Sequence, residues 1–294
     1  MDRRKLILNG VQLGASLVMA PLLTVAAATA QPASSPATRS AVTPAQRSRG
    51  RKSRIFITGS SDGLGHAAAR TLLGDGHEVV VHVRSQARLP AVRELVERGA
   101  IATIGDLSDL EQTRDLARQV NAIGTMDAVI HNAGILSGPQ VLMVNVVAPY
   151  VLTALIRRPR RLIYLSSSMH KGGRVSLDGI DWSGRTGTAG YSESKLFITT
   201  LAAAVARLWP DVYSNAVDPG WVPTKMGGAN APDDLRQGHL TQEWLAASND
   251  PRALTSGGYW YHQRLQQPHA VVRDPHFQNR LLGELARVTG TRLV

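Results

Sequence analysis

The sequence predicts a doubly wound α/β domain over residues 54–294, with a parallel sheet of about seven strands and helices on both faces. Three observations support this fold class. Short apolar runs rich in β-branched residues alternate with longer segments of helical periodicity. The first expected strand, 54–58, is a short apolar run bounded by Gly59 and reads as a buried strand. Hydrophobic residues make up 43% of the 294 residues, enough for a sizeable core.

The elements follow one another in a regular order, which is typical of a Rossmann-type domain. Pro90 stands near the start of the second helix. Ser108 and Glu111 have the spacing of a capping box, with Ser108 as the N-cap of the third helix. The expected strands are 54–58, 78–83, 100–104, 126–130, 162–165 and 212–217, with 259–261 as a seventh. The expected helices are 64–73, 90–98, 108–120, 141–155 and 189–208.

The first 53 residues differ in composition from the rest. A basic start, an apolar stretch and the sequence Ala28-Thr29-Ala30 have the layout of a secretory signal peptide over residues 1–30. Arg3-Arg4 makes it similar to a twin-arginine (Tat) signal, which predicts export to the periplasm or the outside, with only transient membrane contact. An uncleaved inner-membrane anchor and a cytoplasmic protein starting near residue 50 stay open. Residues 31–53 read as a disordered linker.

Charge and cysteine content exclude several classes of site. The net charge is +11, but nine basic residues and one acidic residue fall within residues 1–54. The folded domain is therefore close to neutral, which argues against a nucleic-acid partner. The chain has no cysteine, and its histidines show neither ligand spacing nor carboxylate clusters, so we expect no metal site.

A glycine-rich turn follows the first strand. Gly59, Gly63 and Gly65 give the spacing TGxxxGxG at a strand-to-helix junction. The first glycine permits a tight turn, the second lets the backbone approach a pyrophosphate, and the third lets the helix pack on the strand. The helix start then offers free N–H groups to phosphates. This arrangement predicts a dinucleotide site.

The end of the second strand indicates which dinucleotide is bound. An acidic residue there commonly binds the ribose hydroxyls, but Val83 is followed by Arg84 and Ser85. An arginine pairs well with a 2′-phosphate. We therefore expect NADP(H) in preference to NAD(H).

Further short motifs follow the later strands. The whole series is TGSSDGLG (58–65), Asp106-Leu107, His131-Asn132-Ala133-Gly134, Asn145, Ser166-Ser167, Tyr191-x-x-x-Lys195 and Asp218-Pro219-Gly220-Trp221-Val222-Pro223-Thr224. In this order, over residues 54–228, the chain resembles the single-domain branch of the short-chain dehydrogenase/reductase family. The 24 positions from Ser167 to Tyr191 make it similar to the retinol-dehydrogenase-like branch. Its ending faintly resembles bacterial ketoreductases.

The resemblance implies a role for each matching residue. Ser167, Tyr191, Lys195 and Asn145 would form a catalytic tetrad, with Ser167 chosen over Ser166. Only 13 positions separate Asn132 from Asn145, which is short for the family. Tyr191 and Lys195 would also contact the cofactor, together with Gly59, Ser61, Asp62, Gly63, Leu64, Gly65, Arg84, Asp106, Leu107, Asn132, Ala133, Gly134, Pro219, Gly220, Trp221 and Thr224.

The chemistry of this set centres on Tyr191. Lys195 lies four positions later, on the same helix face. A neighbouring ammonium favours the phenolate, so we expect a pKa below the ordinary value of about 10. Tyr191 could then exchange a proton with a carbonyl or alcohol oxygen, and Ser167 could hydrogen-bond that oxygen.

These observations predict an NADP(H)-dependent oxidoreductase that interconverts a carbonyl and an alcohol on a hydrophobic small molecule. The segment 225–262 is expected on the substrate side, where Met226, Trp244 and Tyr259-Trp260-Tyr261 would line either the pocket or the core. The alternative is a non-catalytic nucleotide-binding regulatory protein of the same fold. A homo-oligomer is compatible with the sequence, but no feature of the sequence requires one.

Overall fold

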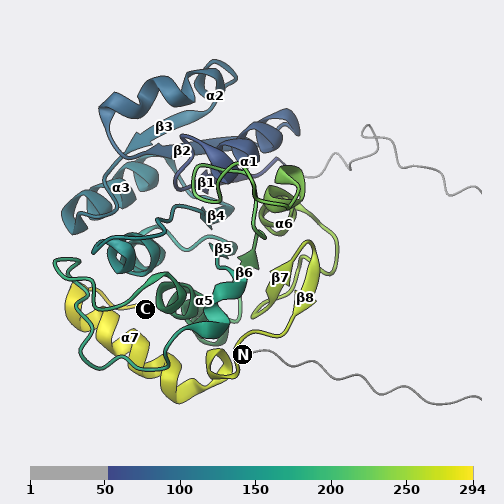
Figure 1. The fold of residues 1–294 in the computed structure, drawn as a ribbon. Helices are drawn as coiled ribbons and strands as arrows, with labels where there is room; N and C mark the ends of the chain where they lie inside the picture. Colours follow the sequence, from purple (N-terminus) through teal and green to yellow (C-terminus); the bar gives the residue numbers. More distant parts are fainter. Residues whose placement is uncertain (1–51, 294) are drawn as a thin grey trace, which may run out of the picture. The chain divides into compact units, whose positions relative to one another are not determined.

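The computed structural model of the protein describes residues 52–293. Its centre is an eight-stranded sheet in the order β3-β2-β1-β4-β5-β6-β7-β8 (Figure 1). Strands β1 to β7 pair in parallel, and β8 runs antiparallel to β7. The doubly wound fold class is confirmed, with one strand more than expected. The proposed signal peptide and residues 31–51 of the proposed linker lie outside the described residues.

The seven predicted strands all form, to within one or two residues of their expected bounds, and an eighth follows them. They are β1 (Arg54–Ile57), β2 (Glu78–Val83), β3 (Ile101–Ile104), β4 (Ala128–His131), β5 (Arg161–Leu165), β6 (Tyr213–Asp218), β7 (Tyr259–Tyr261) and β8 (Arg264–Gln266). The α-helices are α1 (Gly63–Gly74), α2 (Arg93–Glu97), α3 (Leu110–Ile123), α4 (Ala148–Leu155), α5 (Tyr191–Leu208), α6 (Leu235–Ala247) and α7 (Pro275–Thr289).

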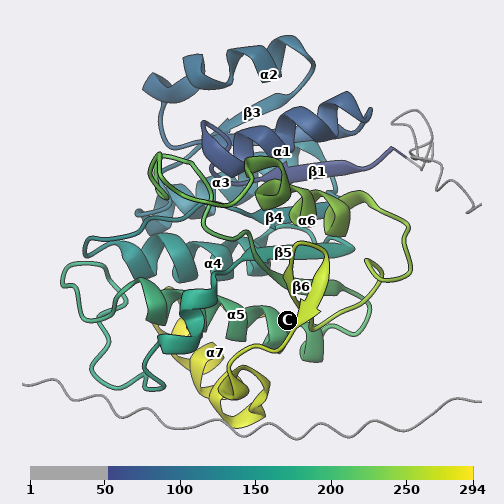
Figure 2. The same ribbon diagram turned by 45° about the vertical axis from the view of Figure 1, so that its right-hand side comes forward.

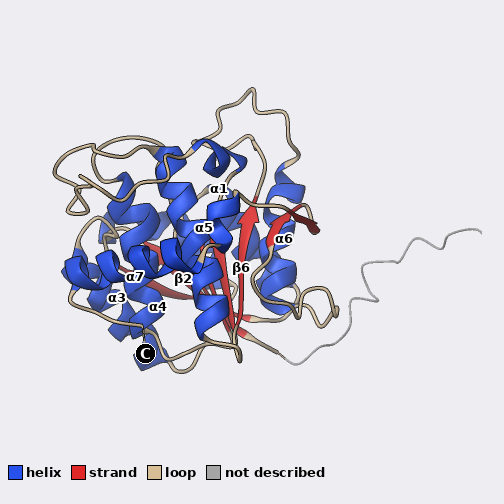
Figure 3. Ribbon diagram, turned by 90° about the horizontal axis from the view of Figure 1, so that it is seen from below, coloured by secondary structure: helices blue, strands red, loops and turns tan. Residues whose placement is uncertain are grey.

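The helices form a layer on each side of the sheet (Figure 3). Helices α3, α4, α5 and α7 share one apolar core with the sheet, and α1, α2 and α6 share the other. Successive side chains of β1 point to opposite faces of the sheet, so Phe56 belongs to the first core while Ile55 and Ile57 belong to the second. Helix α6 packs beside α1, so the chain after β6 returns to the glycine-rich turn (Figure 1 and Figure 2).

Two of the predicted helix starts are wrong. Asp109, not Ser108, caps α3, because its carboxylate accepts the backbone N–H groups of Glu111 and Gln112. The Ser108 hydroxyl instead donates to Asp106 at 2.7 Å. The segment expected to be helical from Pro90 begins earlier, as a 3₁₀ turn over Gln86–Val92, and becomes α-helical only at α2.

Other elements had no counterpart in the sequence prediction. Helices α6 and α7 were not predicted, and neither was the edge strand β8. The helix expected over 141–155 contains a π-helical turn at Met143–Val147, immediately before α4. No helix within residues 52–293 combines the length and the apolar character that a membrane span requires.

Candidate active site

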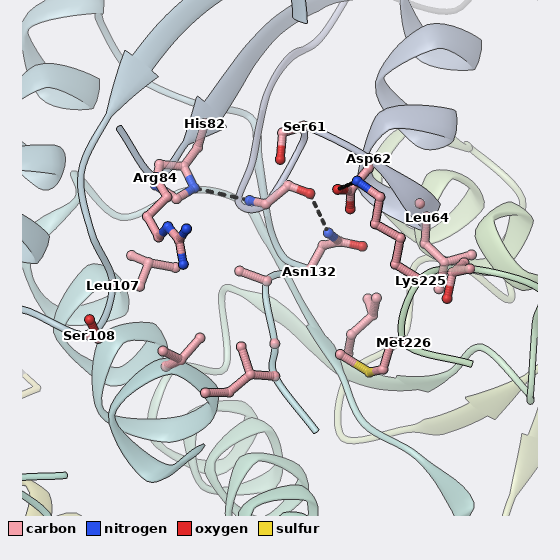
Figure 4. A pocket seen from close by; sticks show the side chains of 18 of the residues that line it. Ser61, Asp62, Leu64, His82, Arg84, Leu107, Ser108, Asn132, Lys225 and Met226 are labelled. Atoms are coloured by element: carbon pink, nitrogen blue, oxygen red, sulfur yellow. Dashed lines mark hydrogen bonds and ion pairs between the residues drawn. The ribbon is translucent and has the colours of Figure 1, made fainter. Parts of the chain in front are cut away.

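A cavity of about 610 Å³ lies where the carboxyl ends of the parallel strands meet. The chain winds outward from β1 through β2 to β3, then returns to β4 on the other side of β1. Ligands bind at such a switch point in open α/β sheets. The residues around the cavity come from the ends of β2 and β5 and from the segments that follow β1, β2, β3, β4, β5 and β6, and Figure 4 shows part of this lining.

The glycine-rich turn forms one wall of the cavity. Gly59 adopts φ +67°, and a Cβ built there would stand 2.9 Å from Ala133 Cα. A Cβ on Gly65 would stand 2.4 Å from Asn132 Nδ2, so Gly65 lies behind the wall as a packing position. Four predicted residues of the turn line the cavity in addition to Gly59: Ser61, Asp62, Gly63 and Leu64.

Asn132 joins the two halves of the sheet at this turn. Its Nδ2 donates to the backbone oxygens of Thr58 and Gly59, at 2.9 and 3.1 Å. Its Oδ1 is buried and has no hydrogen-bond partner among the described residues. Ala133 and Gly134 continue the cavity wall. A narrow glycine cradle with an unused polar atom fits a dinucleotide, as predicted.

His82 on β2 holds the turn in place, a function that the sequence analysis did not assign to it. The Gly59 N–H donates to His82 Nδ1 at 3.0 Å (Figure 4). On the other side of the ring, His82 Nε2 lies 2.7 Å from the Gly105 oxygen. These partners require the neutral tautomer with the proton on Nε2. Burial lowers the pKa of His82 to about 4, so the ring is neutral at physiological pH.

We expect acid to destabilise the fold through His82. Because its pKa in the folded protein is lowered, the unfolded chain takes up a proton from pH about 6.5 downward that the folded chain resists until about 4. Stability should therefore fall across this window, by about 3 kcal/mol from His82 alone. Urea denaturation of the wild type and His82→Gln, near neutral pH and at pH about 4.5, measures this. An equal loss of stability in both proteins would contradict the assignment.

The far side of the cavity, beyond β2 and β3, carries positive charge. Arg84, Asp106 and Leu107 line it as predicted. Arg88, which the sequence analysis overlooked, lines it as well. The Arg88 guanidinium donates to Ser61 at 3.2 Å and to Asp62 at 3.0 Å. Two guanidinium groups therefore flank the part of the cavity next to β2.

Asp62 connects three segments at the rim of the cavity. Besides Arg88, it pairs with Lys225, whose Nζ lies 2.9 Å from Asp62 Oδ2 (Figure 4). The side chains of all three residues are more than a third exposed. Such exposed pairs contribute little to stability and can exchange partners. The carboxylate of Asp62 therefore neutralises the local cations but does not itself suit contact with a phosphate.

Tyr191 and Lys195 lie at the other end of the cavity, on the first two turns of α5. Lys195 Nζ lies 5.3 Å from the centre of the Tyr191 ring and donates to the Leu165 oxygen at 2.7 Å. Because Leu165 ends β5, the lysine is fixed to the sheet. Tyr191 Oη lies 3.9 Å from Met226 Sδ. The pair thus shares one face of α5, as the spacing predicted.

Asn145 sits in the π-helical turn before α4 and is fully bonded. It exchanges two hydrogen bonds with the backbone of Ile135, at 2.9 and 3.0 Å, and donates to Ser194 Oγ at 2.9 Å. A π-turn often marks a functional site. The short link from Asn132 therefore still brings Asn145 next to the helix that carries Lys195, although Asn145 does not line the cavity.

The prediction that Lys195 lowers the pKa of Tyr191 is wrong for the protein without cofactor. Burial, helped by the buried carboxylate of Asp218, raises the pKa of Tyr191 to about 12, while Ser167 opposes the shift. Burial also lowers the pKa of Lys195 to about 8, with Asp218 opposing. Tyr191 is therefore protonated at neutral pH, and Lys195 keeps its charge until the pH approaches 8.

The two serines after β5 have different surroundings. The Ser166 hydroxyl is buried and lies 2.5 Å from Thr199 Oγ1. The Ser167 hydroxyl accepts the Met169 N–H at 3.2 Å. Ser167 also lowers the pKa of the Tyr191 hydroxyl. Ser166 lines the cavity wall and Ser167 does not, but Ser167 is the serine that lowers the pKa of Tyr191. This arrangement favours the choice of Ser167.

The segment after β6 reaches the cavity only in part. Pro219, Thr224, Lys225 and Met226 line it. Trp221 points away, with its side chain 60% exposed and its Nε1 donating to the Gly227 oxygen. Gly220 does not line the cavity but adopts φ +84° beside it.

Trp244, Tyr259 and Trp260, which lie in the expected substrate-side segment 225–262, pack in or against the core instead of lining the pocket. Trp244 and Trp260 meet edge to face at 5.2 Å, and Tyr259 is 3% exposed. Within residues 52–293, no three His, Cys, Asp or Glu side chains are grouped so as to hold a metal ion.

Comparison with known proteins agrees with this arrangement. The family model described as short chain dehydrogenase matches residues 53–235. The chain is 37% identical over 254 residues to the short-chain dehydrogenase chry4 of Gibberella zeae, covering 82% of this chain and 98% of that protein. It is 26% identical to retinol dehydrogenase 13 of Homo sapiens, covering 80% and 84%.

A solved structure shares the fold. The crystal structure of a blue fluorescent protein from a metagenomic library, in complex with NADPH, superposes with a TM-score of 0.59 at 24% identity. The match covers 72% of this chain and 96% of that one. With the ordered motifs, the tyrosine–lysine pair and the match to the family model, the chain belongs to the short-chain dehydrogenases, NAD(P)-dependent oxidoreductases that act on CH–OH and C=O groups.

Proposed function

We propose that the protein interconverts a ketone or aldehyde and the corresponding alcohol on a hydrophobic small molecule, using NADP(H). One observation carries the proposal: a single cavity is lined by Arg84 and Arg88 near one end and by Tyr191 and Lys195 at the other. The sheet order separates these groups by the width of several strands. An extended dinucleotide would span that distance.

The cofactor preference rests on charge. Arg84 and Arg88 supply two planar donor groups suited to a 2′-phosphate, and no acidic residue directly follows β2. Asp106 lies after β3, where its Oδ1 accepts hydrogen bonds from the N–H and the hydroxyl of Ser108. The structural neighbour solved with NADPH supports the same preference by analogy.

In the proposed mechanism, the nicotinamide supplies the hydride when bound. Tyr191, protonated at neutral pH, is in the state needed to donate its hydroxyl proton to a carbonyl oxygen during reduction. The Ser167 hydroxyl would hydrogen-bond the same oxygen as its negative charge develops. The Lys195 ammonium would stabilise the phenolate left on Tyr191 until a proton returns.

The apolar lining near Tyr191 indicates the substrate class. Ile135, Val144 and Met226 contribute to the cavity there. Pockets of this kind bind ligands largely through apolar contact, with few polar groups that set orientation. The similarity to a retinol dehydrogenase, a protein named for an apolar alcohol, supports a hydrophobic substrate.

An assay of the full chain tests the proposal. NADPH oxidation is followed by absorbance with a panel of apolar ketones and aldehydes, and the alcohol formed is quantified. We expect one alcohol for each NADPH consumed. If NADPH binds tightly but no carbonyl is reduced, the regulatory alternative replaces the enzyme.

A further inference from the structure

One polar side chain at the substrate end of the cavity has no part in the mechanism above. Gln140 lines the cavity one helical turn before Val144, whose N–H donates to the backbone oxygen of Gln140 at 3.0 Å. The next residue, Asn145, contacts Ser194 beside Lys195. Gln140 is thereby placed on the same side of the cavity as the tyrosine–lysine pair, among apolar neighbours.

The amide of Gln140 lacks the partner that a buried polar group needs. Its Oε1 is buried, and no atom of the described residues hydrogen-bonds to it. Buried side-chain oxygens nearly always have partners in folded proteins. The amide nitrogen likewise has no hydrogen-bond partner among the described residues, but unlike the oxygen it is not among the fully buried atoms, so it can bind a ligand in the cavity.

The loop before α5 determines which end of the amide faces the ligand. Gly184 lies directly on Gln140, because a Cβ built on Gly184 would stand 2.4 Å from Gln140 Oε1. Gly184 also adopts φ +71°, a conformation that favours glycine. With Oε1 enclosed by this contact, the NH₂ group is the part of Gln140 that can reach into the cavity, and it is a hydrogen-bond donor.

The same loop is held in shape by a single carboxylate. Asp181 accepts the N–H groups of Ser183 and Thr186 at 2.9 and 2.8 Å, and its own N–H donates to Thr188 Oγ1 at 2.7 Å. This bonded loop belongs to the long segment between Ser167 and Tyr191. The loop that lies against Gln140 is therefore held together by its own hydrogen bonds.

We propose that Gln140 is a specificity-determining residue that donates a hydrogen bond to a second oxygen of the substrate. The substrate class is then an apolar compound with the reacting carbonyl and a further carbonyl or hydroxyl oxygen close to it. The inference rests on the proposed function, since it assumes that the cavity holds a carbonyl substrate. A site built to hydrogen-bond one substrate group discriminates strongly against analogues that lack it.

The experiment compares compounds that differ by one oxygen. Benzoylacetone is paired with benzylacetone, and benzil with deoxybenzoin, in which a methylene replaces one carbonyl. For the wild type and Gln140→Met, which has a similar shape without the amide, kcat/KM is measured for both members of each pair. The ratio within a pair is compared between proteins, so that the intrinsic reactivity of the diketones cancels.

We expect Gln140→Met to lower kcat/KM for the dioxygenated member of at least one pair by about tenfold to a hundredfold. Its partner should change by less than about threefold, because it makes no bond to the amide. NADPH affinity should stay the same. As a control, Met226→Leu alters the apolar wall and should shift both members of a pair alike.

Two results would overturn the inference while leaving the proposed function intact. An equal fall in kcat/KM for both members of each pair would give Gln140 a purely structural role, and an unchanged kcat/KM for all four compounds would show that it touches no substrate oxygen. A wild type that binds NADPH but reduces none of the compounds would instead remove the proposed function, and the inference with it.

Discussion

Tyr191→Phe should lower the rate of carbonyl reduction by about a thousandfold while NADPH binding stays within about threefold of the wild type. The substitution removes one oxygen, the atom that donates the proton, and general acid catalysis typically contributes a hundredfold to ten-thousandfold. The aromatic ring remains to pack beside Lys195 and Met226. Single-turnover measurements at saturating NADPH, with fluorescence titration of the cofactor, separate the two effects.

A matched control is Tyr213→Phe. Tyr213 lies on β6, with Arg160 over its ring, and it does not line the cavity. The same atom is removed there, so turnover should be unaffected. Turnover by Tyr191→Phe at even a tenth of the wild-type rate would mean that another group supplies the proton. Loss of NADPH binding as well would indicate that the substitution disturbs the fold.

The pH dependence of this step follows from the burial of Tyr191. Because its pKa is raised to about 12 in the protein without cofactor, Tyr191 stays protonated across the usual assay range. The Lys195 ammonium, with a pKa lowered to about 8, is the group that changes charge within that range. If the reduction rate of the wild type falls as the pH rises through about 8, the fall reports the loss of the proton from Lys195.

The fold could be predicted because buried parallel strands leave a local signal. Most of the strands from β1 to β5 read as short, mainly apolar runs, and glycine or proline marks several of the junctions. The edge strand β8 leaves no such signal, since all three of its residues are exposed and polar residues flank Leu265. It forms because β7 offers an open edge and the His262-Gln263 turn, at φ +46° and +60°, reverses the chain.

The site could be predicted in part, where its residues belong to ordered motifs. Tyr191, Lys195 and the glycines lie where the motifs placed them. His82, Arg88 and Gln140 depend on contacts made across space, which spacing along the chain does not reveal. His82 offers one usable signal: a histidine inside the apolar run Glu78–Val83 must be buried, and a buried ring needs partners at both nitrogens.

The pKa of Tyr191 shows why local reasoning about charge failed. The sequence places Lys195 one turn away and so predicts a lowered pKa. Burial of the hydroxyl and the carboxylate of Asp218, which is 27 positions from Tyr191 in the chain, both act in the opposite direction. Only the pairing of β5 with β6 next to α5 brings that carboxylate close. The sign of the shift was therefore set by tertiary structure.

Replacement of both Arg84 and Arg88 by alanine should weaken NADPH binding by about a hundredfold or more and change NADH binding by less than about threefold. A hydrogen bond to a charged group is worth about 1.5–3 kcal/mol, or roughly tenfold or more in affinity for each arginine. NADH lacks the 2′-phosphate, so removing the arginines takes no such hydrogen bond away from it. Arg88→Ala alone should cost less than Arg84→Ala, because Arg88 must first leave Asp62 and Ser61.

Arg93→Ala is the matched control, since Arg93 is exposed at the start of α2 and does not line the cavity. Raised salt should weaken NADPH binding to the wild type more than to the double variant, because screening acts on the charges that were removed. If the double variant loses affinity for NADPH and NADH equally, the two arginines shape the pocket but do not bind the 2′-phosphate. If neither loses affinity, a 2′-phosphate must lie elsewhere, and the preference for NADP(H) has no basis in the turn after β2.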